Sequence, residues 1–471
     1  MLSRVFLAFI NEQHLFAPTD RVLLAVSGGL DSMVLWHLMQ QAGYAVGVAH
    51  VDFGLRGAES DADADFVAAE ALRRGVPFYQ TRFNTAKEAQ TRGESVQETA
   101  RHLRYTWFAT LLAEHRYVAV ATAHHLNDVL ETVLLNLVRG TGLAGLRGMP
   151  ARHPGNVPGW PAVVRPLWPA TRAQILAYAH QHGLVWREDA SNATEAYSRN
   201  LLRHRVVPVL EQLNPALFQT LTRSLAQLQA ADTLVQNELT ASWGQCGQAV
   251  PGGLVLSVAR LGTLPEPLFR LGEWLRPYGF MPDVLAQCWR AVFPVPASRS
   301  GQVFLAPQHH LTHDRGLLWL LPPHTPHPAQ TLTAWPAQPL PLGTDGHLTA
   351  HSPAPTTYLA DATHPDSPNT VYLDAAALPF PWVLRPWQPG DRFRPLGLNK
   401  SQLVGHFLAT LKLPLPHRQR TWVLVCGGVV VWVVGLRASH QARISAQTTR
   451  VATLIWQPNP ATQLPINPFS A

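Results

Sequence analysis

The chain has 471 residues, a length that predicts about two to four domains. Its hydrophobic content of 46% excludes wholesale disorder, and no run of about 18 or more apolar residues predicts a membrane-spanning helix. The three cysteines, Cys246, Cys288 and Cys426, lie far apart without metal-ligand spacing, which favours a cytoplasmic protein over a disulfide scaffold. The net charge of +7 permits a polyanionic partner such as nucleic acid.

The first motif follows an apolar run, Val22 to Val26, which predicts a buried parallel strand. A turn with two glycines comes next, and then an amphipathic helix predicted to reach Gln41. Free backbone N–H groups at such a helix start can bind phosphate. An ordinary strand-to-helix turn capped by Asp31 is the alternative. The order Ser-Gly-Gly-x-Asp-Ser after a strand resembles the pyrophosphate loop of ATP pyrophosphatases, and the residues it assigns to ATP are Ser27, Gly28, Gly29, Leu30, Asp31 and Ser32.

Strands and helices are then predicted to alternate as far as residue 182. Such alternation indicates an α/β domain with a doubly wound parallel sheet, in which ligands bind at the carboxyl ends of the strands. The polar motifs fall at those ends or at the start of the next helix. The predicted strands are 44–51, 77–83, 117–122 and 163–167, and the predicted helices are 60–74, 95–115, 126–138 and 171–182.

A second motif, Ala-His-His-x-x-Asp-x-x-Glu-Thr, follows the predicted strand 117–122. Asp128 and Glu131 are three residues apart and therefore share a helix face, with His124 on the same side. The two carboxylates and the imidazole are predicted to hold Mg²⁺ beside a triphosphate, and the family resemblance described below implies that Asp31 joins this metal site. The alternative is an acid-rich helix start that is stabilised by the helix dipole.

Two further clusters carry basic residues. Arg101 and Arg104 share a helix face with Glu98, where a helix ion-pair lattice and a ligand site are equally good interpretations. The other cluster begins near Asp189 and continues on a short helix that Pro208 is predicted to end or kink. Its cations suit phosphate contacts, although a solvated basic face is the alternative. The residues of this second cluster are Asp189, Arg199, Asn200, Arg203 and Arg205.

From residue 20 to about 215, the order of these motifs resembles the tRNA(Ile)-lysidine synthetases, a family of PP-loop ATP pyrophosphatases with an adenine nucleotide α-hydrolase-like domain. The segments Gly-Leu-Arg-Gly-Met and Arg-Asn-x-Leu-Arg are the most particular to that family. The chain departs from the pattern at Asn127, where a second acid is usual, and at Asp52-Phe53, where a His is common.

The resemblance divides the chain into a catalytic domain, 1–215, and three later segments. Residues 216–320 are predicted to form a helical tRNA-recognition domain, and 321–370 a proline-rich linker with edge strands. Residues 371–471 are predicted to form a small mixed α/β tRNA-binding domain with a β-hairpin at 422–436. Within a Gly-Asp-Arg-Phe-x-Pro-x-Gly signature, Arg392 and Arg394 are candidates for contacts with the tRNA backbone.

What the resemblance implies is a ligase that forms a carbon–nitrogen bond. ATP would adenylate the wobble cytidine of a tRNA(Ile) with a CAU anticodon, and the ε-amino group of L-lysine would then displace AMP to give lysidine. Asp31, His124, Asp128 and Glu131 are the implied catalytic residues, and His50 joins the ATP-binding set. Arginines of the two basic clusters would bind lysine or tRNA, and a homodimer is compatible with the sequence.

Other functions can be weighed against this interpretation. A tRNA thiolase of the same superfamily needs cysteine chemistry near the loop, yet no cysteine precedes Cys246. An NAD synthetase would not need the additional basic domains. A catalytically inactive tRNA-binding protein would not need the set formed by Asp31, His124, Asp128 and Glu131.

Overall fold

The computed structural model describes residues 1–55, 57–155, 160–188, 198–293, 300–324, 327–355, 369–466 and 468–469. The chain forms two compact units, Met1–Val235 and Gln236–Ala471, which are described separately below. Among the described residues, no helix combines the length and the apolar character needed to cross a membrane.

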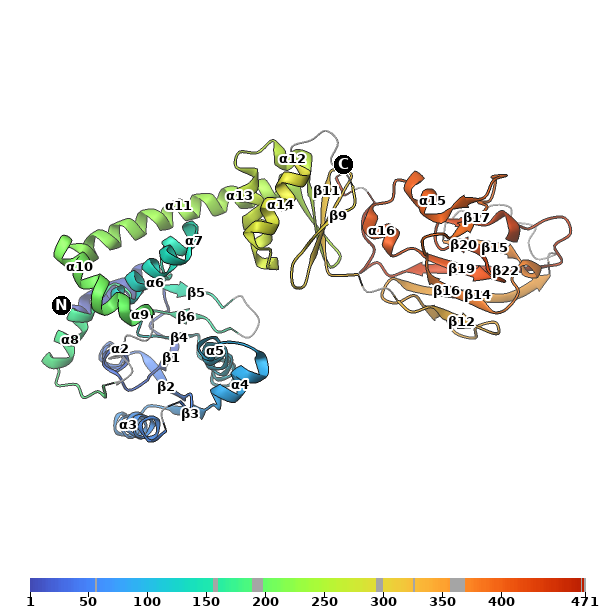
Figure 1. Ribbon diagram of the computed structural model, residues 1–471. Coiled ribbons are helices and arrows are strands. Elements are labelled where there is room, and N and C mark those ends of the chain that lie inside the picture. The colour runs from blue at the N-terminus through green and yellow to red at the C-terminus, as the bar shows by residue number, and fades with distance from the viewer. Residues whose placement is uncertain are drawn as a thin grey trace. The chain divides into compact units, whose positions relative to one another are not determined.

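The first unit is built on a six-stranded sheet with the order β3-β2-β1-β4-β6-β5 (Figure 1). The first five strands in this order run parallel, and β5 pairs antiparallel with β6 at the edge. The strands are β1 Arg21–Ala25, β2 Ala45–Asp52, β3 Phe78–Arg82, β4 Ala119–Ala121, β5 Arg152–His153 and β6 Val163–Val164.

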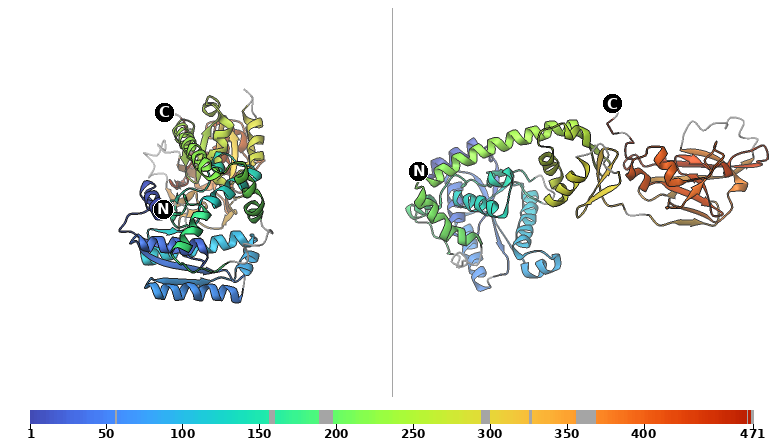
Figure 2. Two further views of the ribbon diagram at one scale, coloured as in Figure 1. Left: turned by 90° about the vertical axis from the view of Figure 1, so that its left-hand side faces the viewer. Right: turned by 45° about the horizontal axis from the view of Figure 1, so that its top comes forward.

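Helices cover both faces of this sheet, so the predicted doubly wound α/β fold is confirmed (Figures 1 and 2). Successive residues of β1 point to opposite faces. Val22 and Leu24 pack with α1, α2, α3 and α8, whereas Leu23 packs with α5. The helices are α1 Leu2–Glu12, α2 Leu30–Gln41, α3 Ala58–Arg74, α4 Thr85–Arg92, α5 Val96–His115, α6 Leu126–Arg139, α7 Leu143–Leu146, α8 Arg172–Gln181, α9 Ser198–Leu201, α10 Val207–Leu213 and α11 Leu217–Cys246.

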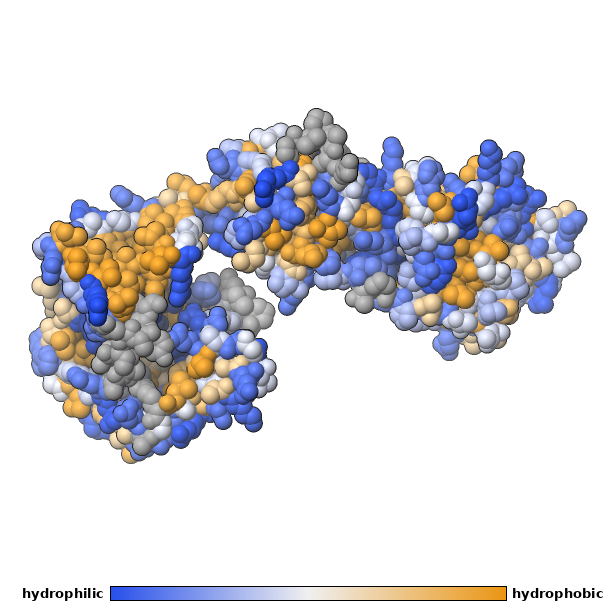
Figure 3. Space-filling model, viewed as in Figure 1, coloured by the Kyte–Doolittle hydropathy of each residue, from blue (hydrophilic) through white to orange (hydrophobic). Residues whose placement is uncertain are grey.

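The segment that carries the second basic cluster differs from the prediction. Between α9 and α10 lies a five-residue π-helical stretch, Leu202–Val206. Pro208 does not end the helix there but lies in the first turn of α10. Backbone N–H groups in a first turn have no intrahelical acceptor, so the lack of an N–H in proline costs no hydrogen bond. Apolar side chains of α10 are exposed nearby, with Val209 at 51% and Leu213 at 78%, and Figure 3 shows an apolar area over this part of the unit.

The second unit begins with a sheet that the sequence analysis missed. Strands β7 Gly247–Val250, β8 Gly253–Ser257, β9 Gln302–Leu305, β10 His310–Asp314 and β11 Leu317–Leu321 form an antiparallel sheet with the order β7-β8-β11-β10-β9. The predicted helices are present as α13 Pro267–Leu275 and α14 Pro282–Val292, with α12 Val258–Gly262 before them. Residues 216–320 are therefore not helical throughout, because short apolar strands flank the periodic helical segments.

The rest of the second unit is β-rich. The hairpin predicted at 422–436 is confirmed as β19 Trp422–Cys426 paired with β20 Val429–Val433. These strands belong to a sheet with β12 Gln330–Leu332, β16 Trp382–Pro386 and β21 Arg437–Ala438. A second sheet contains β13 Leu340–Pro341, β14 Gly346–Pro355, β22 Arg450–Pro458 and β15 Thr370–Asp374. The remaining elements are β17 Arg392–Phe393, β18 Gln402–Leu403, α15 Val404–Thr410 and α16 Leu415–Gln419.

One strand of this second sheet corrects the prediction for 321–370. β14 lies between β13 and β22 and is therefore an inner strand rather than a linker or an edge strand. Its long pairing partner, β22, comes about a hundred residues later in the chain, so local composition does not show the pairing.

Candidate active site

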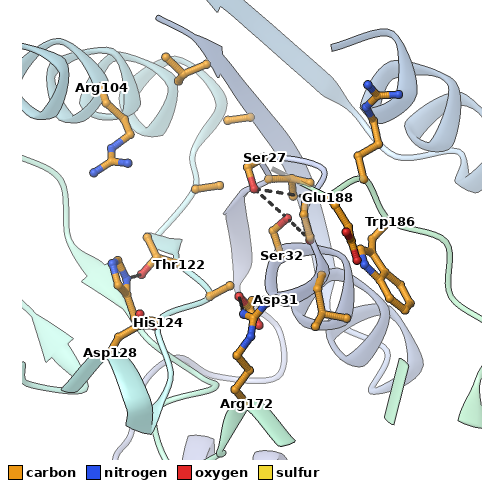
Figure 4. Close-up of a pocket in the computed structure, with 18 of the residues that line it drawn as sticks. Ser27, Asp31, Ser32, Arg104, Thr122, His124, Asp128, Arg172, Trp186 and Glu188 are labelled. Carbon is orange, nitrogen blue, oxygen red and sulfur yellow. Dashed lines mark hydrogen bonds and ion pairs between the residues drawn. The ribbon is translucent and has the colours of Figure 1, made fainter. Parts of the chain in front are cut away.

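A cavity of about 870 Å³ opens at the carboxyl ends of β1, β2 and β4 (Figure 4). One side is formed by the turn after β1, and another by the segment after β4. A third is formed by Trp186, Arg187 and Glu188. The topology thus brings the two predicted polar motifs to one place, as expected for a parallel sheet.

The glycine turn after β1 is held in shape by two hydroxyl groups. Ser27 Oγ lies 3.3 Å from Ser32 Oγ and accepts a hydrogen bond of 3.3 Å from the Gly29 backbone N–H. Ser32 Oγ donates to the Gly29 carbonyl at 2.9 Å. Gly28 has φ of +89° and packs beside Val67, so a side chain at this position would be strained. Leu30, which lines the cavity, begins α2, so the positive end of the α2 dipole faces the cavity.

Asp31, in the first turn of α2, is the carboxylate nearest to this turn. Its Oδ2 accepts a hydrogen bond of 2.9 Å from Arg172 Nη1. Its Oδ1 is buried and has no hydrogen-bond partner, with His125 Nε2 lying 3.7 Å away. The same His125 nitrogen lies 3.6 Å from Asp128 Oδ2, so His125 links the two predicted metal-binding carboxylates.

The predicted metal ligand Glu131 is placed differently. Its side chain is only 1% exposed, and it accepts hydrogen bonds of 2.7 Å from both Arg199 Nε and Arg203 Nε. Arg203 Nη2 also reaches Asp128 Oδ1 at 3.3 Å. Within the described part of the chain, no cluster of three or more His, Cys, Asp or Glu side chains could hold a metal ion. The structure therefore makes Glu131 the anchor of two arginines, because both of its carboxylate oxygens are already bonded.

Asp31 nevertheless fits a cation that is shared with a phosphate ligand. Both oxygens of Asp128, like those of Glu131, already accept hydrogen bonds, from the His125 backbone N–H at 3.0 Å and from Arg203 Nη2 at 3.3 Å. Mg²⁺ is commonly held by one or two carboxylates, with substrate phosphates completing its ligands. The buried and unpaired Asp31 Oδ1 is a free ligand of the required kind.

His124 projects into the cavity from the segment after β4, and its Nδ1 lies 2.8 Å from Thr122 Oγ1 (Figure 4). Burial lowers the pKa of His124 well below its usual value, so its imidazole is neutral at pH 7. Burial alone would raise the pKa of Asp128, but His125, whose backbone N–H donates to Asp128 Oδ2, and Arg199 outweigh it and hold that pKa below its usual value. The cavity thus places a neutral imidazole beside an ionised carboxylate.

The two arginines of α5 separate in the structure. Arg104 lines the cavity, its Nε is buried without a hydrogen-bond partner, and burial lowers its pKa. Arg101 is exposed and lies over the rings of Tyr105 and Trp160, with its guanidinium carbon 5.0 and 5.3 Å from their centroids. Only Arg104 is therefore placed to contact a ligand in the cavity.

Other predicted residues contribute less directly. His50 is buried, and its Nδ1 donates to the Val26 carbonyl at 2.9 Å, so it supports the turn after β1 from behind. Asn200 lies on α9 and Arg205 on the π-helical stretch, where Arg205 is exposed. Asp189 lies outside the described residues. In the second unit, Arg394 is half-buried and bonds to the Leu398 carbonyl and Asn399, beside the exposed Arg392.

Three residues of the site were not predicted. Arg172 and His125 both reach Asp31, and Trp186 forms part of the cavity wall. His125 could have been suspected, because it adjoins His124 and directly precedes α6. Asn127, where the family usually has an acid, accepts a hydrogen bond of 2.9 Å from the Arg172 backbone N–H and thereby ties α6 to the start of α8.

Comparisons with known proteins agree with this geometry. Residues 2–210 match the family model of a PP-loop domain, 251–323 that of a TilS substrate binding domain, and 383–456 that of a TilS substrate C-terminal domain. The tRNA(Ile)-lysidine synthase of Parabacteroides distasonis is 33% identical over 94% of this chain and 97% of its own. The proteins of the same name from Bacteroides thetaiotaomicron and Geobacter sulfurreducens are 31% and 32% identical, over 96% and 95% of this chain and 99% and 95% of their own.

Proposed function

The chain belongs to the tRNA(Ile)-lysidine synthase family, and from this membership we propose how its residues divide the two steps of lysidine formation. It is an ATP-dependent tRNA-modifying ligase that forms a carbon–nitrogen bond. The observation that carries the proposal is the cavity, which is lined by the glycine turn, Asp31 and Arg104.

In the first step, the oxygen on C2 of the wobble cytidine attacks the α-phosphorus of ATP, and the bond to the β-phosphate breaks. The backbone N–H groups at the start of α2, with Ser27 and Ser32, bind the pyrophosphate as it leaves. Asp31 would hold Mg²⁺, which when bound neutralises charge on the phosphates. Arg104 provides a further cation for the phosphates or the cytidine.

In the second step, the ε-amino group of lysine attacks C2, and AMP leaves with the former C2 oxygen. The neutral imidazole of His124 accepts a hydrogen bond from the attacking amine and orients it, and because burial makes this imidazole a weak base, the proton that the amine loses passes to solvent. Arg199 and Arg203 hold Asp128 and Glu131 in place beside it. We therefore propose that Arg199 and Arg203 position these two carboxylates, whereas the sequence analysis predicted that they bind lysine or tRNA.

The test is incubation of the full chain with ATP, radiolabelled lysine and a panel of tRNAs. Label is expected only in tRNA(Ile) with a CAU anticodon, and its incorporation is expected to depend on Mg²⁺. Label in tRNAs with other anticodons would contradict the proposed specificity, and incorporation in the presence of a chelator would contradict the role of the metal.

Arg392 and Arg394 of the second unit are proposed to contact the tRNA backbone. We expect Arg392→Ala plus Arg394→Ala to weaken tRNA binding and to reduce the slope of log affinity against log salt by roughly 2, one for each lost phosphate contact. Filter binding at several salt concentrations measures the slope. A double variant of two exposed arginines, Arg116→Ala plus Arg450→Ala, is the control for the loss of two charges. Equal slopes for the two double variants would contradict the assignment.

A homodimer and a cytoplasmic location remain predictions. The exposed apolar side chains of α10 are the kind of surface on which proteins associate. Both predictions are independent of the roles assigned to the cavity residues.

A further inference from the structure

Arg172 is the residue of the cavity whose role neither the sequence motifs nor the family comparison assigns. It begins α8, and its backbone position is fixed twice. Thr171 and Gln174 form a capping box around it, and Asn127 Oδ1 accepts its backbone N–H at 2.9 Å. Its side chain is held less firmly, because 41% of it is exposed and, within the part of the chain that the structure describes, it bonds to Asp31.

The bond from Arg172 uses one of the two oxygens of Asp31, the carboxylate that is proposed to hold the cation. Arg172 Nη1 takes Asp31 Oδ2 at 2.9 Å, while Asp31 Oδ1 stays buried and unpaired (Figure 4). A guanidinium and a divalent cation on one carboxylate repel each other. A cation that binds Asp31 therefore competes with Arg172 unless the arginine finds another anion.

Two other arginines of the cavity are already paired with carboxylates. Arg203 bonds to Glu131 and Asp128, and Arg187 bonds to Asp63. Arg172 differs from them because its partner is a carboxylate beside the phosphate-binding turn. Since guanidinium groups bind phosphate oxygens at least as readily as carboxylates, a polyphosphate in the turn offers Arg172 the replacement anion.

We propose that Arg172 exchanges partners: it neutralises Asp31 while the nucleotide is absent, and it moves to the polyphosphate of ATP when Asp31 takes the cation. The exchange couples the two binding events, because the nucleotide removes the positive charge that opposes the cation. This inference rests on the proposed function, in which Asp31 holds the metal.

The test uses the full chain with Mn²⁺ as the probe cation, measured by electron paramagnetic resonance without nucleotide. We expect Arg172→Ala to bind Mn²⁺ more tightly, on the order of tenfold, because the competing charge is gone. The same variant is expected to bind ATP more weakly, also on the order of tenfold, when measured by equilibrium dialysis. A variant that was merely misfolded would lose affinity for both ligands. Arg172→Lys, which keeps the charge, is expected to restore Mn²⁺ affinity to near the wild-type value.

Two further variants separate this inference from the function on which it rests. Arg187→Ala removes a positive charge from the same cavity at the same side-chain exposure of 41%, and it is expected to change Mn²⁺ affinity less than Arg172→Ala does. Asp31→Asn is expected to weaken Mn²⁺ binding. If Asp31→Asn weakens it but Arg172→Ala leaves Mn²⁺ or ATP affinity unchanged, the partner exchange is wrong. If Asp31→Asn leaves Mn²⁺ affinity unchanged, the metal role of Asp31 is wrong, and the exchange is wrong with it.

Discussion

Asp31→Ala is expected to reduce ATP–pyrophosphate exchange, measured in the presence of tRNA, by roughly a thousandfold or more. The variant removes the buried Oδ1 that is available to a cation, and it leaves Arg172 without its partner beside the phosphate-binding turn. Binding of tRNA is expected to stay within about twofold of wild type, since the predicted tRNA contacts lie on other residues. Filter binding measures this second quantity on the same protein preparation.

The matched control is Asp61→Ala. Asp61 also lies in the first turn of a helix, α3, and also pairs with an arginine, Arg82, at 2.9 Å, but it is exposed and does not line the cavity. Its loss is expected to leave exchange unchanged. If Asp31→Ala retained exchange near the wild-type rate, the glycine turn and Asp31 could not be the site of adenylation.

Glu131→Gln is expected to destabilise the first unit by about 3 kcal/mol, because two arginines would then share a buried neutral amide. For a unit of this size, that corresponds to a fall in Tm of about 8 °C, measurable by scanning calorimetry of the full chain. Because both carboxylate oxygens of Glu131 already bond to arginines, we expect Mn²⁺ affinity to change far less than in Asp31→Asn.

Glu70→Gln provides the comparison. Glu70 also bonds to two arginines, Arg73 and Arg74, which hold its pKa at about 2, but it lies on α3 with its side chain 17% exposed. Because Arg73 is 67% exposed and Glu70 reaches solvent, whereas Glu131 is buried, this variant is expected to lower the Tm less than Glu131→Gln does. If the Glu131→Gln protein had the wild-type Tm but bound Mn²⁺ much more weakly, that result would contradict the anchoring role and support Glu131 as a metal ligand.

The sequence by itself was sufficient for the fold of the first unit and for the family. The apolar run of β1 and the glycine turn that follows it are local signals, and each appears in the structure where it was predicted. The hairpin of β19 and β20 is local in the same sense. By contrast, the pairing of β8 with β11 and that of β14 with β22 join segments that are distant in the chain, so local patterns do not show them. The hairpins β7–β8, β9–β10 and β10–β11 are local, and the sequence analysis overlooked them.

The sequence also indicated which residue types gather at the carboxyl ends of the strands, but not which of them pair. Glu131 meets Arg199 and Arg203, which lie 68 and 72 residues further along, and Asp31 meets Arg172 across 141 residues. Periodicity encodes which face of a helix is apolar, since neighbouring residues alone decide it. The partner of a charged side chain depends instead on distances of a few ångströms between separate elements, and only the tertiary structure decides those distances. For that reason, the sequence determined which residue types gather at the carboxyl ends of the strands. The tertiary structure decided that Glu131 pairs with Arg199 and Arg203 and that Arg172 pairs with Asp31.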